Sequence, residues 1–349
     1  MAENNTGVII GADTHKRSHT VALIASTGLE LAAQEFEANA KGYKDALAWA
    51  CSFGEPLRAG IESTGSYGAG LCSYLIESGI MVYDVYSPDK KRRRLKGKDD
   101  VKDAFQAAQA ALSYTRCAQA KDRNEAVSAV LALENAYCLC VRQRTACINA
   151  LKAEIVKLPD AMRARLEPKR NAELFKACAA LRVTEGPASG TRLALRHYAK
   201  QILSLDKEAS FLGKEVKRYA EELLPNTMEL VGVGPHNAVT FLGAAGPNIG
   251  RLKTSASFVM LCGSSPVPAS TGDTHHHRLN RGGNRKANSA LYIMAITRMK
   301  LCEKTQAYIA KKMSEGKSKD DGIRALKTYL AREVYNALMA DLAMLGLVS

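Results

Sequence analysis

Short apolar runs alternate with polar turns over the first hundred residues of the chain. Residues 7–12 and 19–25 form two such runs, separated by a polar turn. Residues 29–36 form a third run, so the start of the chain predicts a three-stranded antiparallel meander. Apolar residues then recur at helical spacing over residues 40–51.

Two further strands follow, with a helix between them. Residues 57–61 predict a strand that ends at Glu62, and residues 80–86 predict another. The apolar positions Leu71, Leu75 and Ile76 have helical spacing. With a helix after the last strand, the order is strand, strand, strand, helix, strand, helix, strand, helix. This order matches the ribonuclease H type of α/β fold.

The middle of the chain, from about residue 104 to residue 158, is rich in alanine and predicts helix throughout. An apolar seam steps along it by four and three residues: Tyr137, Val141, Arg144, Ile148, Leu151, Ile155 and Leu158. This spacing is typical of a coiled coil, with Arg144 as its one interruption. Residues 193–224 can supply the partner helix, from the same chain or from a second subunit.

The pattern changes at Leu230, where LVGVGPHNAVTFLGAAG predicts a glycine hairpin between two helices. Such a turn presents backbone N–H groups that bind phosphate. A closing helix is predicted over residues 320–345. We therefore expect a mostly α-helical C-terminal domain with a helix-hairpin-helix-like turn, and three parts with the boundaries 1–115, 116–224 and 225–349.

The charge of the chain narrows the choice of partner. Its 349 residues include 49 Lys and Arg against 35 Asp and Glu, a formal net charge of +14. This balance favours a polyanionic partner such as nucleic acid. Because aromatic residues make up only 6% of the chain, we expect phosphate contacts rather than base stacking to dominate.

The cysteines and the hydropathy of the sequence indicate the cellular compartment in which we expect the protein. The nine cysteines are an odd number and contain no CxxC pair, which favours reduced thiols and a reducing cytoplasm over a disulfide or zinc framework. The start of the sequence has no signal-peptide pattern, and no stretch approaches eighteen uncharged apolar residues. We expect a protein that is neither exported nor membrane-spanning.

Four carboxylates stand at positions that a ribonuclease H type of sheet brings together. Asp13 and Glu62 end the first and fourth strands, and Asp100 and Asp103 leave one face of the next helix if Asp99 is its N-cap. Carboxylates are hard oxygen ligands suited to a pair of magnesium ions. Two alternatives stay open: Asp99 replaces Asp100 if the helix starts one residue differently, and Asp13 alone suits a turn.

Two basic stretches are candidate nucleic-acid contacts. One precedes the acidic helix and comprises Lys90, Lys91, Arg92, Arg93, Arg94, Lys96 and Lys98. The other is a glycine-containing loop with Arg278, Arg281, Arg285 and Lys286. Both suit phosphate binding, although a charge run taken alone is also typical of a solvated loop.

The stretch GADTHKRSHT allows one rival interpretation. It is similar to the first phosphate loop of sugar kinases and actin-like ATPases, which share the same type of sheet. Those proteins also need a second glycine-rich phosphate loop and an adenosine loop, and neither occurs where it should lie. The basic run also suits nucleic acid better than ATP.

Seven motifs together resemble the insertion sequence one-ten transposases, also called DEDD transposases. They are GADTHK, IESTGSYGAGL and KGKDDVKDA near the start, and LVGVGPHNA, CGSSPVPASTG, HRLNRGGNRKANSAL and EGKSKDDGIRALKTYLAREVY near the end. The resemblance implies an N-terminal domain like the junction nuclease RuvC, a coiled coil used in oligomerisation and a C-terminal domain with a nucleophilic serine. It also implies a Mg²⁺-dependent recombinase acting on donor and target DNA, in many members directed by a structured bridge RNA.

The position of the nucleophile departs from the family pattern. Many members read Ser-Ser-Gly after the proline, whereas this chain reads Ser270-Thr271-Gly272, which puts Thr271 at the expected position. Either Ser270 attacks after a small shift of the loop, or Thr271 attacks with its own hydroxyl. We prefer Ser270, because the extra methyl group of threonine crowds an attack on phosphorus.

Two other functions compete with a guided recombinase. A junction-resolving endonuclease would cut a four-way junction without any RNA, but it has no use for a serine-bearing C-terminal half. A non-catalytic nucleic-acid scaffold would keep the fold but not the activity. The presence of all four acids argues against the scaffold.

Overall fold

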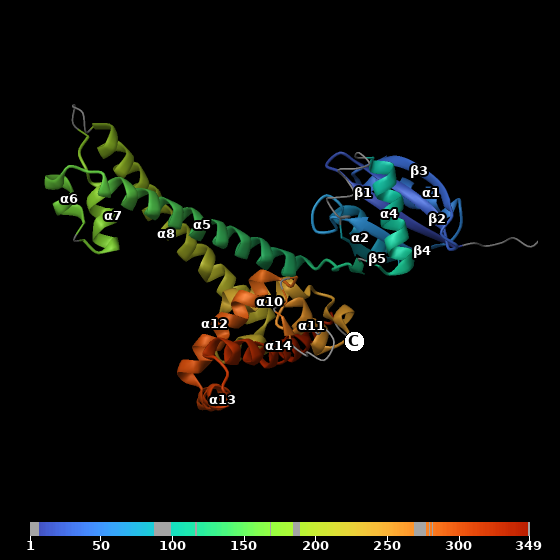
Figure 1. Ribbon diagram of the computed structural model, residues 1–349. Coiled ribbons are helices and arrows are strands. Elements are labelled where there is room, and N and C mark those ends of the chain that lie inside the picture. Colours follow the sequence, from blue (N-terminus) through green and yellow to red (C-terminus); the bar gives the residue numbers. More distant parts are fainter. Residues whose placement is uncertain are drawn as a thin grey trace, which may run out of the picture. The chain divides into compact units, whose positions relative to one another are not determined.

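The structure is a computed structural model that describes residues 7–86, 99–115, 117–167, 169–183, 189–268, 277–278, 280 and 282–347. Its contacts divide the chain into two compact units (Figure 1). Unit 1 comprises Met1–Arg123 together with Gly246–Arg251. Unit 2 comprises Asn124–Ala245 and Leu252–Ser349. The fold is thus mixed α/β, with a six-stranded sheet in unit 1 and mainly helices in unit 2.

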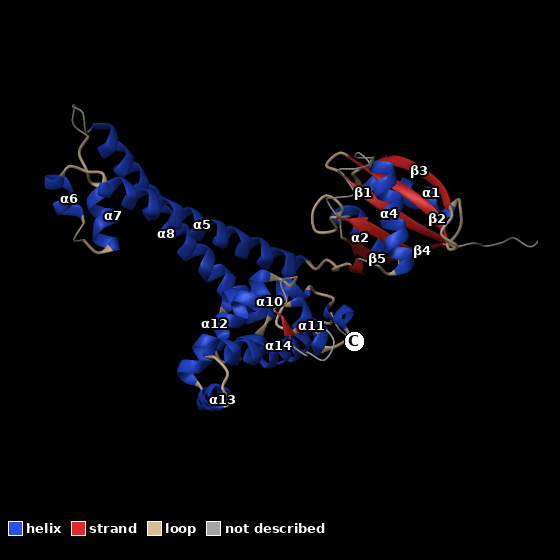
Figure 2. Ribbon diagram, viewed as in Figure 1, coloured by secondary structure: helices blue, strands red, loops and turns tan. Residues whose placement is uncertain are grey.

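A six-stranded sheet forms the centre of unit 1 (Figure 2). Its strands are β1 (Val8–Thr14), β2 (Ser18–Ala25), β3 (Glu30–Glu37), β4 (Pro56–Glu62), β5 (Met81–Val85) and β6 (Cys117–Gln119), in the order β3-β2-β1-β4-β5-β6. The pairs β1–β2 and β2–β3 are antiparallel, which confirms the predicted meander. The pairs β1–β4 and β4–β5 are parallel, and β6 is antiparallel to β5.

Helices cover both faces of this sheet. The helices α1 (Ala40–Cys51) and α2 (Ala69–Glu77) bury Ala46, Ala50 and Leu75 against one face, in a core that includes Ile10 and Val21. The helix α4 (Asp100–Ser113) covers the other face with alanines. Successive residues of a strand point to opposite faces, so this division repeats the alternation of apolar positions in the sequence.

The strand β6 corrects the prediction of continuous helix over residues 104–158. The helix α4 ends at Tyr114, whose φ of 51° is left-handed, and β6 then pairs with β5 before the next helix begins. Asn248 holds the segment after β6: its side-chain N–H donates to the Ala120 carbonyl at 2.9 Å, and its Oδ1 accepts the Asp122 N–H at 3.1 Å. The prediction of continuous helix was wrong because β6 forms by pairing with β5, which lies about thirty residues earlier in the chain. No glycine or proline near β6 marks the end of the helix in the sequence.

Two long helices, α5 (Glu125–Val156) and α8 (Ser189–Leu223), pair in unit 2. They run antiparallel, since Tyr137 approaches Gly213 while Leu151 shares a core with Leu195. The predicted seam therefore finds its partner in the same chain. Arg144, its one polar interruption, forms an ion pair with Asp206 on α8.

Short helices pack at both ends of this pair. The helices α6 (Asp160–Leu166) and α7 (Asn171–Ala179) bury Leu166, Phe175 and Cys178 beside the end of α5. The rest of unit 2 contains α9 (Pro225–Met228), α10 (Pro235–Ala245), α11 (Ser255–Leu261), α12 (Arg285–Leu301), α13 (Glu303–Ser314) and α14 (Lys319–Met344), while most of the 3₁₀ helix η1 (Ile249–Leu252) belongs to unit 1. A two-stranded ribbon, β7 (Val267–Pro268) with β8 (His277–Arg278), interrupts these helices.

The predicted hairpin between two helices is present between α9 and α10. Gly232 adopts a left-handed φ of 87°, and a Cβ there would lie 2.9 Å from the Met294 carbonyl oxygen of α12. The fully buried Asp341 of α14 accepts the backbone N–H groups of Asn226 and Thr227 at the start of α9.

Within the described part of the chain, no helix combines the length and the apolar character needed to cross a bilayer.

Candidate metal centre

The helix α4 lies directly on the backbone of the central strands. An ideal Cβ at Gly11 would lie 2.0 Å from the Ala104 carbonyl oxygen, and one at Gly60 would lie 2.2 Å from that of Ala107. No real Cβ tolerates such distances, so glycine in β1 and β4 and alanine in α4 permit this close approach. The contact fixes the height of α4 above the sheet.

Strand alternation then decides which acids face α4. Gly11 faces the helix, so Asp13, two residues later in β1, lies on the same face. Glu62 stands in the same relation to Gly60 in β4. Because Ala12 pairs with Ile61 in the parallel β1–β4 ladder, Asp13 and Glu62 lie next to each other at the carboxyl ends of their strands. Each is only 6% exposed.

The start of α4 supplies the other two acids. Asp99 is the N-cap, and its carboxylate accepts the backbone N–H groups of Val101 and Lys102 and pairs with the Lys102 ammonium at 3.0 Å. The hydrogen bond from Lys102 lowers the pKa of Asp99. Asp100 is therefore the first helical residue, and the buried Asp103 follows one turn later on the sheet side of α4.

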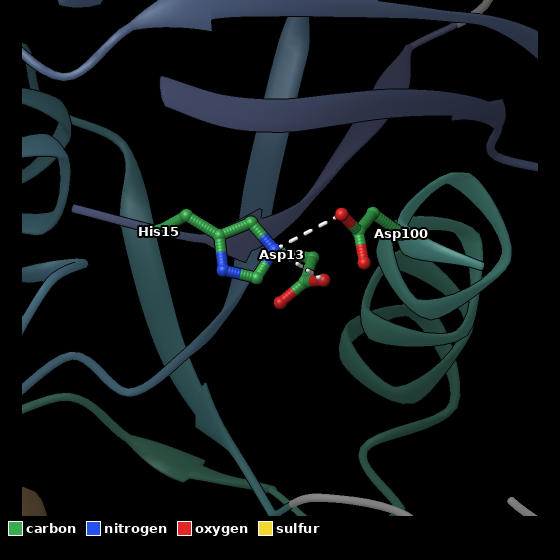
Figure 3. Close-up of side chains that lie close together, drawn as sticks. All are labelled: Asp13, His15 and Asp100. Carbon is green, nitrogen blue, oxygen red and sulfur yellow. Dashed lines mark ion pairs between the residues drawn. The ribbon is translucent and has the colours of Figure 1, made fainter. Parts of the chain in front are cut away.

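Asp13 and Asp100 meet at the imidazole of His15 (Figure 3). The His15 Nε2 atom lies 3.4 Å from Asp13 Oδ2 and 3.1 Å from Asp100 Oδ2. One ligand atom from each of the three residues lies within 4.8 Å of the other two. The side chain of Asp13 is 8% exposed, whereas those of His15 and Asp100 are about 40% exposed, so the cluster opens to solvent on one side.

Neighbouring hydrogen bonds hold the strand ends that carry these groups. The Thr14 hydroxyl donates to the Glu62 carbonyl at 2.9 Å and ties the end of β1 to the end of β4. The loop after Glu62 turns through Ser63, which has a left-handed φ of 59°, and the Thr64 hydroxyl then donates to Asp84 on β5 at 2.7 Å. These bonds fix the backbone on both sides of Glu62.

His15 was not among the predicted site residues. Its signal in the sequence is the spacing Asp13-Thr14-His15, because two residues that stand two positions apart at a strand end leave the same face. Two carboxylates and an imidazole are a donor set that fits a hard or borderline divalent cation. This cluster can therefore hold a metal ion.

Several predicted site residues lie outside the described residues. They are the whole basic run Lys90, Lys91, Arg92, Arg93, Arg94, Lys96 and Lys98, together with Ser270, Thr271 and Arg281. Arg278 is described only as part of β8. Arg285 and Lys286 are the first two residues of α12 rather than loop residues, with Asn284 as N-cap. Lys286 approaches Asn135 of α5 at 3.5 Å.

Comparison with known families identifies two separate parts of the chain. Residues 10–157 match the DEDD-type domain model of the IS110 family, described as a transposase. Residues 225–310 match a second model, described as transposase of the IS116/IS110/IS902 family. No curated protein matches the chain. All of the sheet that bears the acidic cluster except the first two residues of β1 lies inside the first match, and the α9–α10 hairpin lies inside the second. The chain thus carries the two transposase domains of the IS110 family and is an enzyme that cleaves and rejoins DNA.

Proposed function

We propose that this protein is the transposase of an insertion element, in which a ribonuclease H-like, RuvC-like N-terminal domain cuts DNA with the help of Mg²⁺. The observation that carries the proposal is the meeting of Asp13, His15 and Asp100 in the domain that matches the DEDD-type model. The order of strands and the placement of α4 on the face of Asp13 and Glu62 are consistent with this fold.

The residues present fit a divalent cation. Asp13 and Asp100 would hold it, together with the neighbouring acids Glu62 and Asp103. When bound, such an ion polarises a phosphodiester and favours deprotonation of an attacking hydroxyl. The imidazole of His15 lies between the two carboxylates and could supply a further nitrogen ligand.

The second part of the proposal concerns the C-terminal domain. A hydroxyl of Ser270 or Thr271 would lose its proton and attack the phosphodiester, so that one P–O bond of the DNA strand breaks, one strand end leaves as a free hydroxyl and the other stays bonded to the protein through the phosphate. Such a hydroxyl is a poor nucleophile unless a base or metal activates it and the phosphate is held in line. A structured guide RNA would select donor and target DNA, and a dimer or tetramer of the chain would assemble on them. The two separate family matches, over residues 10–157 and 225–310, support a division between a metal-binding domain and a second transposase domain.

The acidic site is tested by charge-removing substitutions. We expect Asp13→Asn and Asp103→Ala to lower Mg²⁺-dependent strand cleavage by about 100-fold or more, since a bound metal is worth several kcal/mol to such a reaction. Binding to DNA or RNA should persist or tighten, because each change removes negative charge from a polyanion site. Cleavage of supercoiled donor and target DNA, with the RNA encoded beside the gene, measures the first effect.

A control and an independent readout complete the test. Asp45→Asn removes an exposed acid from α1 and should leave cleavage unchanged. Binding of Mn²⁺ in place of Mg²⁺, followed by electron paramagnetic resonance, should weaken in Asp13→Asn but not in Asp45→Asn. Full cleavage by Asp103→Ala would refute the role of this acid. Symmetric nicking of a four-way junction without RNA would instead favour a junction-resolving endonuclease.

The nucleophile is tested by trapping. The covalent adduct should map to Ser270 by mass spectrometry and disappear in Ser270→Ala. An adduct that survives in Ser270→Ala but is lost in Thr271→Ala would reverse this preference. Adducts that persist in the double variant would remove both hydroxyls from the mechanism.

A further inference from the structure

Unit 2 contains two cavities of about 520 and 680 Å³ that share a wall. The first lies among α13, α14 and the turn after α11, and the second lies between that turn and α12. The residues common to both are Gly263, Asn280, Arg324 and Lys327. The two cavities therefore form a continuous groove around Lys327, and we call it the α12–α14 groove.

Lys327 is a half-buried cation at the centre of this groove. Its ammonium donates to Asn288 Oδ1 at 2.9 Å, and the Asn288 side-chain N–H in turn donates to the Cys262 carbonyl at 2.8 Å. Among the described residues, no carboxylate lies within ion-pair distance of Lys327. Burial, with a smaller effect from Arg324, lowers its pKa. A half-buried ammonium that faces only a neutral amide can gain an anionic partner at little further cost in desolvation.

Other cations line the groove, and they differ in how far they are neutralised. Arg324 pairs with Asp321 at 2.6 Å, and Lys312 pairs with Glu315 at 2.7 Å. Arg285, at the first position of α12, and Arg332, exposed on α14, line the groove with no ion pair to a described residue. The groove is thus positive overall, with Asp321 as its one acidic lining residue among those described.

The walls suit a single nucleotide strand more than a duplex. Gly263, with a left-handed φ of 65°, meets Gly283 so closely that a Cβ on Gly283 would lie 2.3 Å from Gly263 Cα. Two backbones therefore cross at this point of the wall with no side chain between them. Tyr292 lines one cavity and Tyr329 the other, and they are 48% and 53% exposed. A basic groove with exposed aromatic rings is typical of single-strand binding, because phosphates meet the cations and bases stack on the rings.

The groove is also continuous in sequence with the candidate nucleophile. Ser264, Ser265 and Pro266 line the first cavity, and β7 leads from them to Pro268, two positions before Ser270. The Thr328 hydroxyl donates to the Ser264 carbonyl at 2.8 Å and fixes this turn to α14. A hydroxyl nucleophile requires that its phosphodiester be held nearby.

We propose that the α12–α14 groove binds the single DNA strand that is to be cut, with Lys327 holding a phosphodiester and Tyr292 and Tyr329 stacking on adjacent bases. This assignment rests on the proposed transposase function, whose DNA substrate it places in unit 2. Lys327 is a positioning residue: it holds the phosphate, while a separate hydroxyl attacks it.

The test uses the full-length protein in EDTA, so that neither metal binding nor cleavage contributes. A twelve-nucleotide single-stranded DNA containing 4-thiothymidine is crosslinked by light, and the modified residues are identified by mass spectrometry. We expect crosslinks at Tyr292 or Tyr329. Lys327→Met keeps the apolar length of the side chain and should lower their yield about tenfold, the effect of losing a charged hydrogen bond. Lys327→Arg should restore most of the yield.

Two further variants control for folding and for general charge. Arg332→Gln changes an exposed residue and should lower the yield about threefold without affecting the fold, as one weaker phosphate contact. Lys300→Met removes an exposed lysine of α12 that lines neither cavity, and should leave the yield unchanged. Thermal unfolding midpoints show whether each variant folds.

The outcomes separate this inference from the proposed function. Wild-type yield in both Lys327→Met and Arg332→Gln, or crosslinks only outside the groove, would overturn the inference even if Mg²⁺-dependent cleavage is observed. Asp13→Asn should crosslink like the wild type, so loss of cleavage in that variant does not bear on the groove. Stronger crosslinking of an RNA of the same sequence would assign the groove to RNA and overturn its assignment to DNA.

Discussion

At the scale of single residues, burial and hydrogen bonding shift the pKa of several cysteines in opposite directions. Burial raises the pKa of Cys72 and of Cys262 to about 12, and that of Cys178 to about 11. Cys302 at the start of α13 shows the opposite shift, because a hydrogen bond with the Thr305 side chain lowers its pKa. The thiolate is the reactive form, so the same shifts set the order of reaction with alkylating reagents.

We predict that iodoacetamide at pH 7.5 labels Cys302 first and leaves Cys72 and Cys262 unlabelled in the folded protein. A raised pKa means less thiolate at this pH, and both of these side chains are at most 3% exposed. Time-resolved peptide mass spectrometry gives the order. Cys51, which is exposed, serves as the reference for an accessible thiol. Labelling of Cys262 at the rate of Cys51 without denaturant would contradict the burial.

Prediction from sequence succeeded at this scale where a residue's role depends on its immediate neighbours. Asp99 was predicted as N-cap because capping uses backbone groups two and three residues away. The ion pair of Arg144 with Asp206 joins two helices that are far apart in the sequence, so its partner was not predictable. His15 was missed because its meeting with Asp100 depends on how α4 packs on the sheet.

At the scale of elements, the contact of α4 with β1 and β4 sets the geometry of the acidic cluster. Gly11 and Gly60 let the Ala104 and Ala107 carbonyl groups approach the strands directly. Any side chain at either glycine would push α4 outward, and Asp100 and Asp103 would move with it. Stability and metal binding should therefore respond together to a change in this packing.

We predict that Gly11→Ala lowers the free energy of unfolding by about 1–3 kcal/mol, the usual cost of overpacking. The variant should also weaken Mn²⁺ binding, since the carboxylates of α4 move away from Asp13. Urea unfolding measures the first effect and metal titration the second. Gly190→Ala is the matched control: it lies in α8, nothing lies within 4 Å of its added Cβ, and alanine favours helix. Equal stability of the Gly11→Ala variant and wild type would contradict the packing described.

The elements that repeat a strong local pattern were predictable from the sequence. The helix over residues 40–51 and the first five strands follow helical spacing and apolar alternation closely. The strand β6 does not, because its three residues gain their conformation by pairing with β5, and Asn248, more than a hundred residues further along the chain, holds the segment that follows β6. The ribbon of β7 and β8 has two residues in each strand, too few to show a period.

At the scale of the whole molecule, the net charge of +14 favours a polyanionic partner. The way the basic residues are distributed along the chain leads to a prediction about the salt dependence of binding. The basic run from Lys90 to Lys98 holds seven of the chain's cations within nine positions. If these side chains contact the phosphates of a guide RNA, the salt dependence of binding reports how many do so. Phosphate contacts carry no sequence information, so sequence preference should not change with them.

We predict that the double variant Lys90→Gln/Arg92→Gln binds structured RNA with a salt slope smaller by about one per lost phosphate contact. Binding of the RNA that copurifies with the protein, measured between low and physiological salt, gives the slope. The variant Lys41→Gln/Lys44→Gln removes the same charge from exposed positions of α1 and should leave the slope unchanged. Affinity for structured RNA no greater than for random duplex DNA of equal length would argue against a guide.

Asn248 has a consequence for the evolution and engineering of such enzymes. It comes from the segment Gly246–Arg251, which follows α10 in the chain but belongs to unit 1. A gene fragment that stops at residue 123 would lack the side chain that holds the segment after β6. Hybrids that join the first half of one transposase to the second half of another would therefore build unit 1 from two different proteins. We expect functional hybrids to be those in which residues 1–123 and residues 246–251 come from the same protein.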